Sequence, residues 1–141
     1  MRVLITDDVH SILIAKLNRI GYMVDYQPDI SIHEVKLCIE NYDGLIINSK
    51  ILVDHEMMDL GSKLKWIGRL GSGLEIIDLN YAKNKQIHIL STPEANCNAV
   101  AEHALGMLIG MLRNIPRANR EVKNMHWFRE KNRGEELSVK K

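Results

Sequence analysis

Short apolar runs alternate with segments of mixed polarity along the first part of the chain, and the runs have the composition of β-strands. All but the second are almost continuously apolar, which is typical of strands covered on both faces. This alternation predicts an α/β fold with a doubly wound, five-stranded parallel sheet and right-handed crossovers. The expected strands cover residues 3–5, 22–26, 44–48, 65–70 and 87–90.

The segments between these strands carry helix signals. Apolar residues recur at helical spacing from Val9 to Ile20, just before Gly21. Ser31 and Glu34 have the spacing of a capping box, in which each side chain satisfies a backbone N–H group of the other residue. A short helix capped by Asp54 is expected next, and a further helix is expected over 78–85.

The pattern changes after Pro93. Residues 98–113 form a nearly all-apolar run that predicts one long helix, and Pro116 is expected to interrupt it. A polar helix over 117–125 and a charged, exposed arm over 129–141 are expected to follow. We therefore predict a compact domain over 1–97 and a helical extension over 98–141.

Composition narrows the possible functions. Charged residues make up 26% of the 141 residues and the net charge is +1, so neither a nucleic-acid-binding surface nor a disordered acidic chain is expected. The apolar stretch 99–112 contains Glu102 and His103 and is too short to span a membrane. Cys38 and Cys97 lack metal-ligand spacing and suggest reduced thiols in a cytoplasmic protein. The six histidines have no ligand spacing with a third partner, so no metal site is predicted.

The strongest candidate for chemistry is Gly71-Ser72-Gly73, directly after the fourth apolar run. Backbone N–H groups without bulky side chains let an anion approach, and a helix starting after the glycines would add a favourable partial charge. A plain tight turn is the alternative interpretation. Asn48 ends the third expected strand and Ser49 follows it, so both are expected at the same edge of the sheet, where small ligands bind.

A dinucleotide fingerprint is not present in this loop. Position 76, where G-x-G-x-x-G requires its third glycine, is Ile76. The loop therefore does not predict a dinucleotide site of the usual kind.

Three spaced stretches, residues 68–78, 87–96 and 100–107, resemble the NAD-dependent D-2-hydroxyacid dehydrogenases, with the phosphoglycerate dehydrogenase branch nearest. The resemblance implies that residues 1–97 are a flavodoxin-like substrate-binding domain. It also implies that the helix after Pro93 crosses towards a nucleotide-binding domain that this chain does not include. The family's catalytic His, Arg and Glu belong to that other part, so no catalytic residue is assigned here.

The resemblance also implies a binding site. Asn48, Ser49 and the backbone of Gly71, Ser72 and Gly73 would hold the carboxylate of a small 2-hydroxy or 2-keto acid. Asn96 and Val100 would lie near the nicotinamide of NAD, which this chain alone would bind weakly or not at all. Many relatives carry Arg at the position of Asn48, and Leu74-Glu75 replaces the more usual Thr followed by Asp or Asn.

Two other functions remain open at this point. Residues 3–8 look like the opening of a response-regulator receiver domain, although Asn48 stands where the phosphorylatable Asp is needed. A catalytically inactive protein that pairs with itself through the 99–115 helix is the second alternative. An apolar helix of that length invites association, and the resemblance places it and the following arm near a dimer interface. A homodimer is therefore expected.

Overall fold

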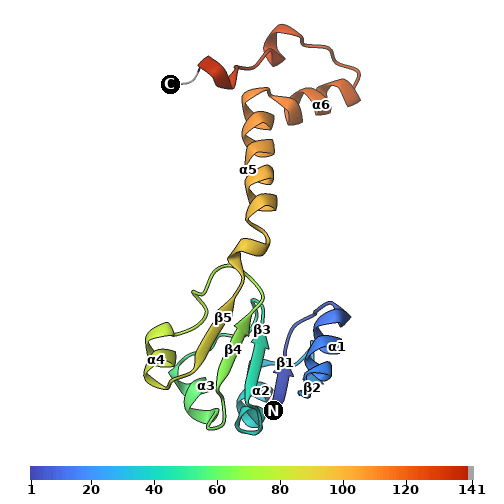
Figure 1. Ribbon diagram of the computed structural model, residues 1–141. Coiled ribbons are helices and arrows are strands. Elements are labelled where there is room, and N and C mark those ends of the chain that lie inside the picture. Colours follow the sequence, from blue (N-terminus) through green and yellow to red (C-terminus); the bar gives the residue numbers. More distant parts are fainter. Residues whose placement is uncertain (140–141) are drawn as a thin grey trace. The chain divides into compact units, whose positions relative to one another are not determined.

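Five parallel strands form the sheet of the first part of the computed structural model, which describes residues 1–139 (Figure 1). The strand order is β2-β1-β3-β4-β5, with every neighbouring pair parallel. This is the flavodoxin-like order, so the predicted fold is confirmed. The strands are β1 (Arg2–Ile5), β2 (Met23–Tyr26), β3 (Gly44–Ile47), β4 (Trp66–Arg69) and β5 (His88–Ser91).

The crossover helices begin where the sequence predicts caps. Ser31 and Glu34 form the complete capping box, and the carboxylates of Asp54 and Asp78 accept from the third amide of their helices at 2.9 Å. These caps satisfy donors that a helix cannot satisfy itself. The helices are α1 (Ser11–Arg19), α2 (Ile32–Cys38), which continues into η1 (Ile39–Asn41), α3 (His55–Leu60) and α4 (Leu79–Asn84).

The core lies on both faces of the sheet. One face packs against α2, α3 and α4 through Leu45, Ile67 and Met57, which are fully buried. The other face packs against α1 through Val3, Ile5 and Ile46. The two layers leave the carboxyl ends of the strands as the edge from which the connecting loops project.

Backbone contacts divide the chain into two compact units, Met1–Pro93 and Glu94–Lys141. The second unit contains α5 (Cys97–Leu112), α6 (Ile115–Lys123), η3 (Glu130–Asn132) and η4 (Leu137–Val139), and η2 (Pro93–Ala95) spans the division. The long apolar helix is therefore present, within one residue of its predicted bounds. The chain buries none of the side chains of α5. In the described part of the chain, no helix combines the length and the apolarity that a membrane crossing needs.

One expectation for this unit was wrong. The helix break falls at Asn114, which adopts a left-handed conformation with φ of 53°, and not at Pro116. Pro116 instead lies in the first turn of α6, where a missing N–H group costs nothing. The charged segment is exposed over most of its described residues, as expected, and hydrogen bonds connect it to α6. Asn132 accepts from Nε of Arg117 at 2.9 Å and donates to Glu121.

Candidate functional site

The loop after β4 presents three backbone donors without partners. The last ladder bond at this edge runs from the amide of Leu70 to the carbonyl of Ile47, at 3.0 Å. Beyond it, the amides of Gly71, Ser72 and Gly73 donate to no acceptor among residues 1–139. Backbone donors normally find partners. Three consecutive free amides therefore form a place where an anion can be bound.

The expectation that a helix starts directly after these glycines was wrong. Residues 74–78 pass back over the core, and α4 begins only at Leu79. Ile77 forms a bridge with Val53, whose amide donates to the carbonyl of Ile76 at 2.8 Å. Burial of Ile77 holds this segment in place. The loop amides therefore act without a helix N-terminus behind them.

Asn48 is held at the carboxyl end of β3 by a buried carboxylate. Asp7 accepts from the amide of Asn48 at 2.9 Å and from the hydroxyl of Thr6 at 2.8 Å. Asp7 is only 9% exposed, so it joins the ends of β1 and β3. The side chains of Asn48 and Ser49 are exposed at this edge. Lys50 is directed elsewhere, because its ammonium group donates to the carbonyl of Pro28.

Arg69 is a further candidate residue that the sequence did not single out. Its guanidinium packs onto Gly71: a Cβ added to that glycine would overlap Nη1 and lie 3.0 Å from Nη2. Among the described residues, Nε of Arg69 is the one buried side-chain nitrogen or oxygen without a hydrogen-bond partner. The only signal in the sequence was the glycine two positions later.

An acidic residue lies on the other side of the loop. A Cβ added to Gly73 would stand 2.8 Å from Oε1 of Glu75 and closer still to its second oxygen. No ion pair with Glu75 is formed by residues 1–139. The loop therefore lies between a cation over Gly71 and an anion over Gly73.

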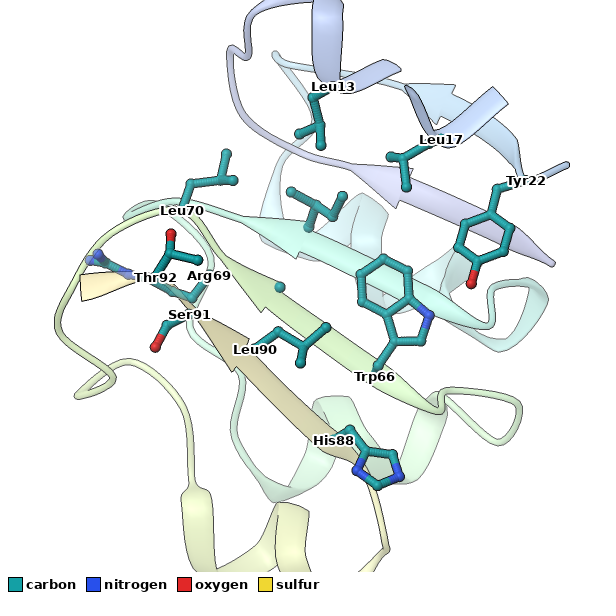
Figure 2. A pocket seen from close by; sticks show the side chains of 12 residues that line it. Leu13, Leu17, Tyr22, Trp66, Arg69, Leu70, His88, Leu90, Ser91 and Thr92 are labelled. Carbon is teal, nitrogen blue, oxygen red and sulfur yellow. The ribbon is translucent and has the colours of Figure 1, made fainter. Parts of the chain in front are cut away.

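An apolar groove of about 530 Å³ adjoins this edge. Figure 2 shows Arg69, Ser91 and Thr92 where β4 and β5 end, and Trp66 and His88 where these strands begin. Leu13 and Leu17 of α1 form the facing wall. The groove thus offers carbon contacts along the sheet and polar groups at its carboxyl end.

The two residues expected near a nicotinamide belong to the second unit. Asn96 precedes α5 and its carbonyl accepts from the amide of Val100 at 3.0 Å. Val100 is 58% exposed. Gly106 and Gly110 lie inside α5, so they form no loop that could hold a pyrophosphate. The described residues therefore do not fit NAD by themselves, and they contain no cluster of three or more His, Cys, Asp or Glu residues suited to a metal ion.

This fold, with free donors at the carboxyl edge of a flavodoxin-like sheet, is typical of α/β domains that bind small ligands. The family model of the D-isomer specific 2-hydroxyacid dehydrogenase catalytic domain matches residues 3–135. The chain therefore belongs to the D-2-hydroxyacid dehydrogenase family, whose members are NAD-dependent oxidoreductases. The family membership expected from the sequence is confirmed.

Curated relatives cover the whole of the chain. It is 34% identical over 139 residues to a D-3-phosphoglycerate dehydrogenase of Synechocystis and 32% identical over 140 residues to one of Archaeoglobus fulgidus. Each match covers 99% of this chain, but only 25% and 27% of the respective relatives. The chain thus spans about a quarter of their length.

Solved structures show the same fold. The TT0316 protein of Thermus thermophilus matches with a TM-score of 0.82 at 25% identity, over 97% of this chain and 46% of that chain. An NAD-dependent formate dehydrogenase of Staphylococcus aureus in complex with NAD matches with a TM-score of 0.80 at 20% identity, over the same shares. The latter likeness concerns the fold alone.

Neither alternative function receives support from these findings. A receiver domain needs a phosphorylatable Asp after β3, and that position holds Asn48. The two curated relatives named above are D-3-phosphoglycerate dehydrogenases, and each match covers 99% of this chain.

Proposed function

We propose that this chain is the substrate-binding part of an NAD-dependent oxidoreductase that acts on the CH–OH group of a small D-2-hydroxy acid resembling 3-phosphoglycerate. The amides of Gly71, Ser72 and Gly73 hold the carboxylate, and the side chains of Asn48 and Ser49 complete the contacts. The observation that carries the proposal is the set of three free amides at the carboxyl edge of the sheet. Donors fixed in advance bind a carboxylate with little reorganisation.

The chemistry itself belongs to groups outside the described residues. NAD supplies the hydride chemistry of the complete enzyme, and Asn96 and Val100 lie near its nicotinamide end. The described residues contain no loop for the pyrophosphate, so the chain alone binds NAD weakly or not at all. No residue of this chain is assigned a catalytic role.

The second unit provides the contact between two copies of the chain. The helix over 99–115 and the arm after it form a homodimer interface in the cytoplasm. Support comes from the exposed apolar side chains of α5, among them Met111, which is 73% exposed, and Leu105, which is 53% exposed. Apolar surface of this extent favours association.

Amide-resolved NMR on the 141-residue chain tests the carboxylate site. Titration with D-glycerate is expected to shift the amide signals of Gly71, Ser72 and Gly73. Glycerol is the matched control, because it has the same carbon skeleton without the carboxylate. Shifts with both compounds, or with neither, would contradict the proposal. Oxidation of NADH by the chain alone with a 2-keto acid would contradict the assignment of the chemistry to another part.

A further inference from the structure

The connections of the sheet diverge at the carboxyl ends of β1 and β3. These two strands pair with each other, but the chain leaves β1 towards α1 on one face and leaves β3 towards α3 on the other. Diverging connections leave a crevice outside the strand ends, and open α/β sheets bind their ligands at such a switch point. The groups at the ends of β1 and β3 are therefore placed to influence a ligand.

A buried carboxylate crosses this switch point. Oδ2 of Asp7, which follows β1, accepts from the amide of Asn48, which follows β3, at 2.9 Å. The same oxygen accepts from the hydroxyl of Thr6, a fully buried residue, at 2.8 Å. The free amides of the candidate site lie one strand further along the sheet, after β4. Asp7 therefore stands beside the site and is not one of its donors.

The peptide group between Ile47 and Asn48 relates Asp7 to that loop. Its N–H group donates to Asp7, and its carbonyl accepts from the amide of Leu70 at 3.0 Å. Leu70 directly precedes Gly71, the first residue with a free amide. Because a peptide group is planar and rigid, a single unit connects the carboxylate after β1 to the start of the loop after β4.

The charge of Asp7 strengthens this connection. A hydrogen bond to a carboxylate is about twice as strong as one between neutral groups. It also polarises the peptide group, which makes the carbonyl of Ile47 a better acceptor for the amide of Leu70. Since Asp7 is only 9% exposed, water competes little for its oxygens. The bond to Asn48 is therefore suited to fix the backbone on both sides of it.

We propose that Asp7 is a positioning residue of the carboxylate site. It keeps the side chains of Asn48 and Ser49 at the end of β3, and it fixes the start of the loop that carries the free amides. Asp7 acts through the peptide group after Ile47 and does not touch the ligand. This assignment rests on the proposed function, because the loop amides must bind the substrate carboxylate.

Five proteins, each the full 141-residue chain, test this role. The unmodified chain is compared with Asp7→Ala, which removes the acceptor, and with Asp7→Asn, which keeps an acceptor oxygen without the charge. Thr6→Val is the first control, because it removes the other hydrogen bond of the same carboxylate oxygen. Asp8→Asn is the second, because Asp8 is an exposed carboxylate that follows the same strand and accepts from Tyr26.

NMR titration with D-glycerate measures the affinity of each protein, and the amide proton signals of Asn48 and Leu70 report the two hydrogen bonds of the peptide group. Urea unfolding measures stability separately. A role confined to stability would lower the free energy of unfolding in the Asp7 variants without changing their affinity for glycerate.

Asp7→Ala is expected to weaken glycerate binding about ten-fold, as loss of one charge-assisted hydrogen bond does. Asp7→Asn should weaken it about three-fold, because a neutral acceptor remains. In both variants the amide signals of Asn48 and Leu70 move together. Thr6→Val and Asp8→Asn leave the affinity within about two-fold of the unmodified chain. Removing a negative charge by itself would favour an anion, so a loss of affinity in the Asp7 variants is specific to positioning.

Three outcomes would overturn the assignment. If both Asp7 variants bind glycerate as tightly as the unmodified chain, or more tightly, Asp7 has no such role and the proposed function stands. If Thr6→Val weakens binding as much as Asp7→Ala does, affinity follows stability and not the bond to Asn48. If the unmodified chain does not bind glycerate, the proposed function fails and the assignment fails with it. Should Asp7→Ala not fold, Asp7→Asn decides by the same measurements.

Discussion

Arg69 lies over Gly71 so closely that any side chain at position 71 would overlap its guanidinium. The φ angle of Gly71 is not positive, so backbone conformation does not require glycine there. The close approach of Arg69 is the reason instead. Arg69 and Gly71 are two positions apart in the sequence and pack directly on each other at the candidate site.

Gly71→Ala is expected to displace Arg69 and the loop beside it, and to reduce the affinity for D-glycerate about ten-fold, as loss of one charge-assisted hydrogen bond does. The free energy of unfolding should change by less than about 1 kcal/mol, because the far end of a flexible side chain can move. NMR titration and urea unfolding measure the two quantities. Gly68→Ala is the control, since its Cβ would make only ordinary contacts with Trp66 and Ile46. An unchanged affinity in Gly71→Ala would mean that the position of Arg69 over Gly71 does not affect binding.

Glu75→Gln is expected to raise the affinity for every acid tested, by about two- to ten-fold. The reason is that one negative charge beside Gly73 is removed while the size of the side chain is kept. The gain should shrink at high salt, because exposed charges are screened. Glu40→Gln, an exposed residue of η1, controls for the change in net charge. The same gain in both variants would argue against a local role of Glu75.

Gly44→Ala is expected to destabilise the first unit. A Cβ on Gly44 would overlap the six-membered ring of Trp66 on the neighbouring strand and stand 2.9 Å from its Cη2. Displacing a packed indole costs about 1–3 kcal/mol. Urea unfolding followed by circular dichroism measures the loss, with Gly68→Ala as the control from the same sheet. A stability equal to that of the control would show that the ring moves freely.

The capping box of α2 should make stability sensitive to acid. Hydrogen bonds from the hydroxyl and the amide of Ser31 hold the pKa of Glu34 below its ordinary value. Since the folded pKa is lowered, this stabilisation is complete above the unfolded pKa of about 4.3 and is lost as the pH falls through the folded value. Ser31→Ala should therefore cost about 1 kcal/mol at pH 7 and clearly less in acid.

Urea unfolding at neutral pH and at several pH values below about 4.3 tests this difference, because the loss begins at the unfolded pKa of Glu34 and continues as the pH falls through the folded value. Ser62→Ala is the matched control, because Ser62 is exposed and its hydroxyl has no partner among the described residues. An effect of Ser31→Ala that stays the same at both pH values would mean that Glu34 takes no part in the cap.

Gly106→Leu should weaken the proposed dimer without harming the single chain. A Cβ at this position meets nothing within 4 Å in the chain, and leucine favours helix over glycine by about 1 kcal/mol. Sedimentation at micromolar concentration is expected to show a dimer for the unmodified chain and more monomer for the variant. Ala15→Leu, at an exposed position of α1, controls for an added surface leucine. A monomer before any substitution would refute the dimer.

Local patterns were enough to predict the sheet and its helices. The continuous apolar runs of β1 and β3 indicate buried parallel strands, and the capping residues Ser31, Asp54 and Asp78 mark helix starts. These features depend on residues within a few positions of each other. The wrong predictions also concerned short segments. The helix break was predicted at Pro116, but it lies at Asn114. A helix was predicted directly after the glycines, where Ile77 instead packs into the core.

The amino-acid sequence by itself thus determined the strands, the caps and the small residues that follow β4. Only the tertiary structure decided what surrounds them. The bond from the amide of Asn48 to Asp7 joins residues 41 positions apart, and the placing of Arg69 over Gly71 and of Glu75 over Gly73 depends on how each side chain leaves its loop. Periodicity reports which residues are buried, but the direction of a charged side chain at a sheet edge is set by the packing of every strand beside it.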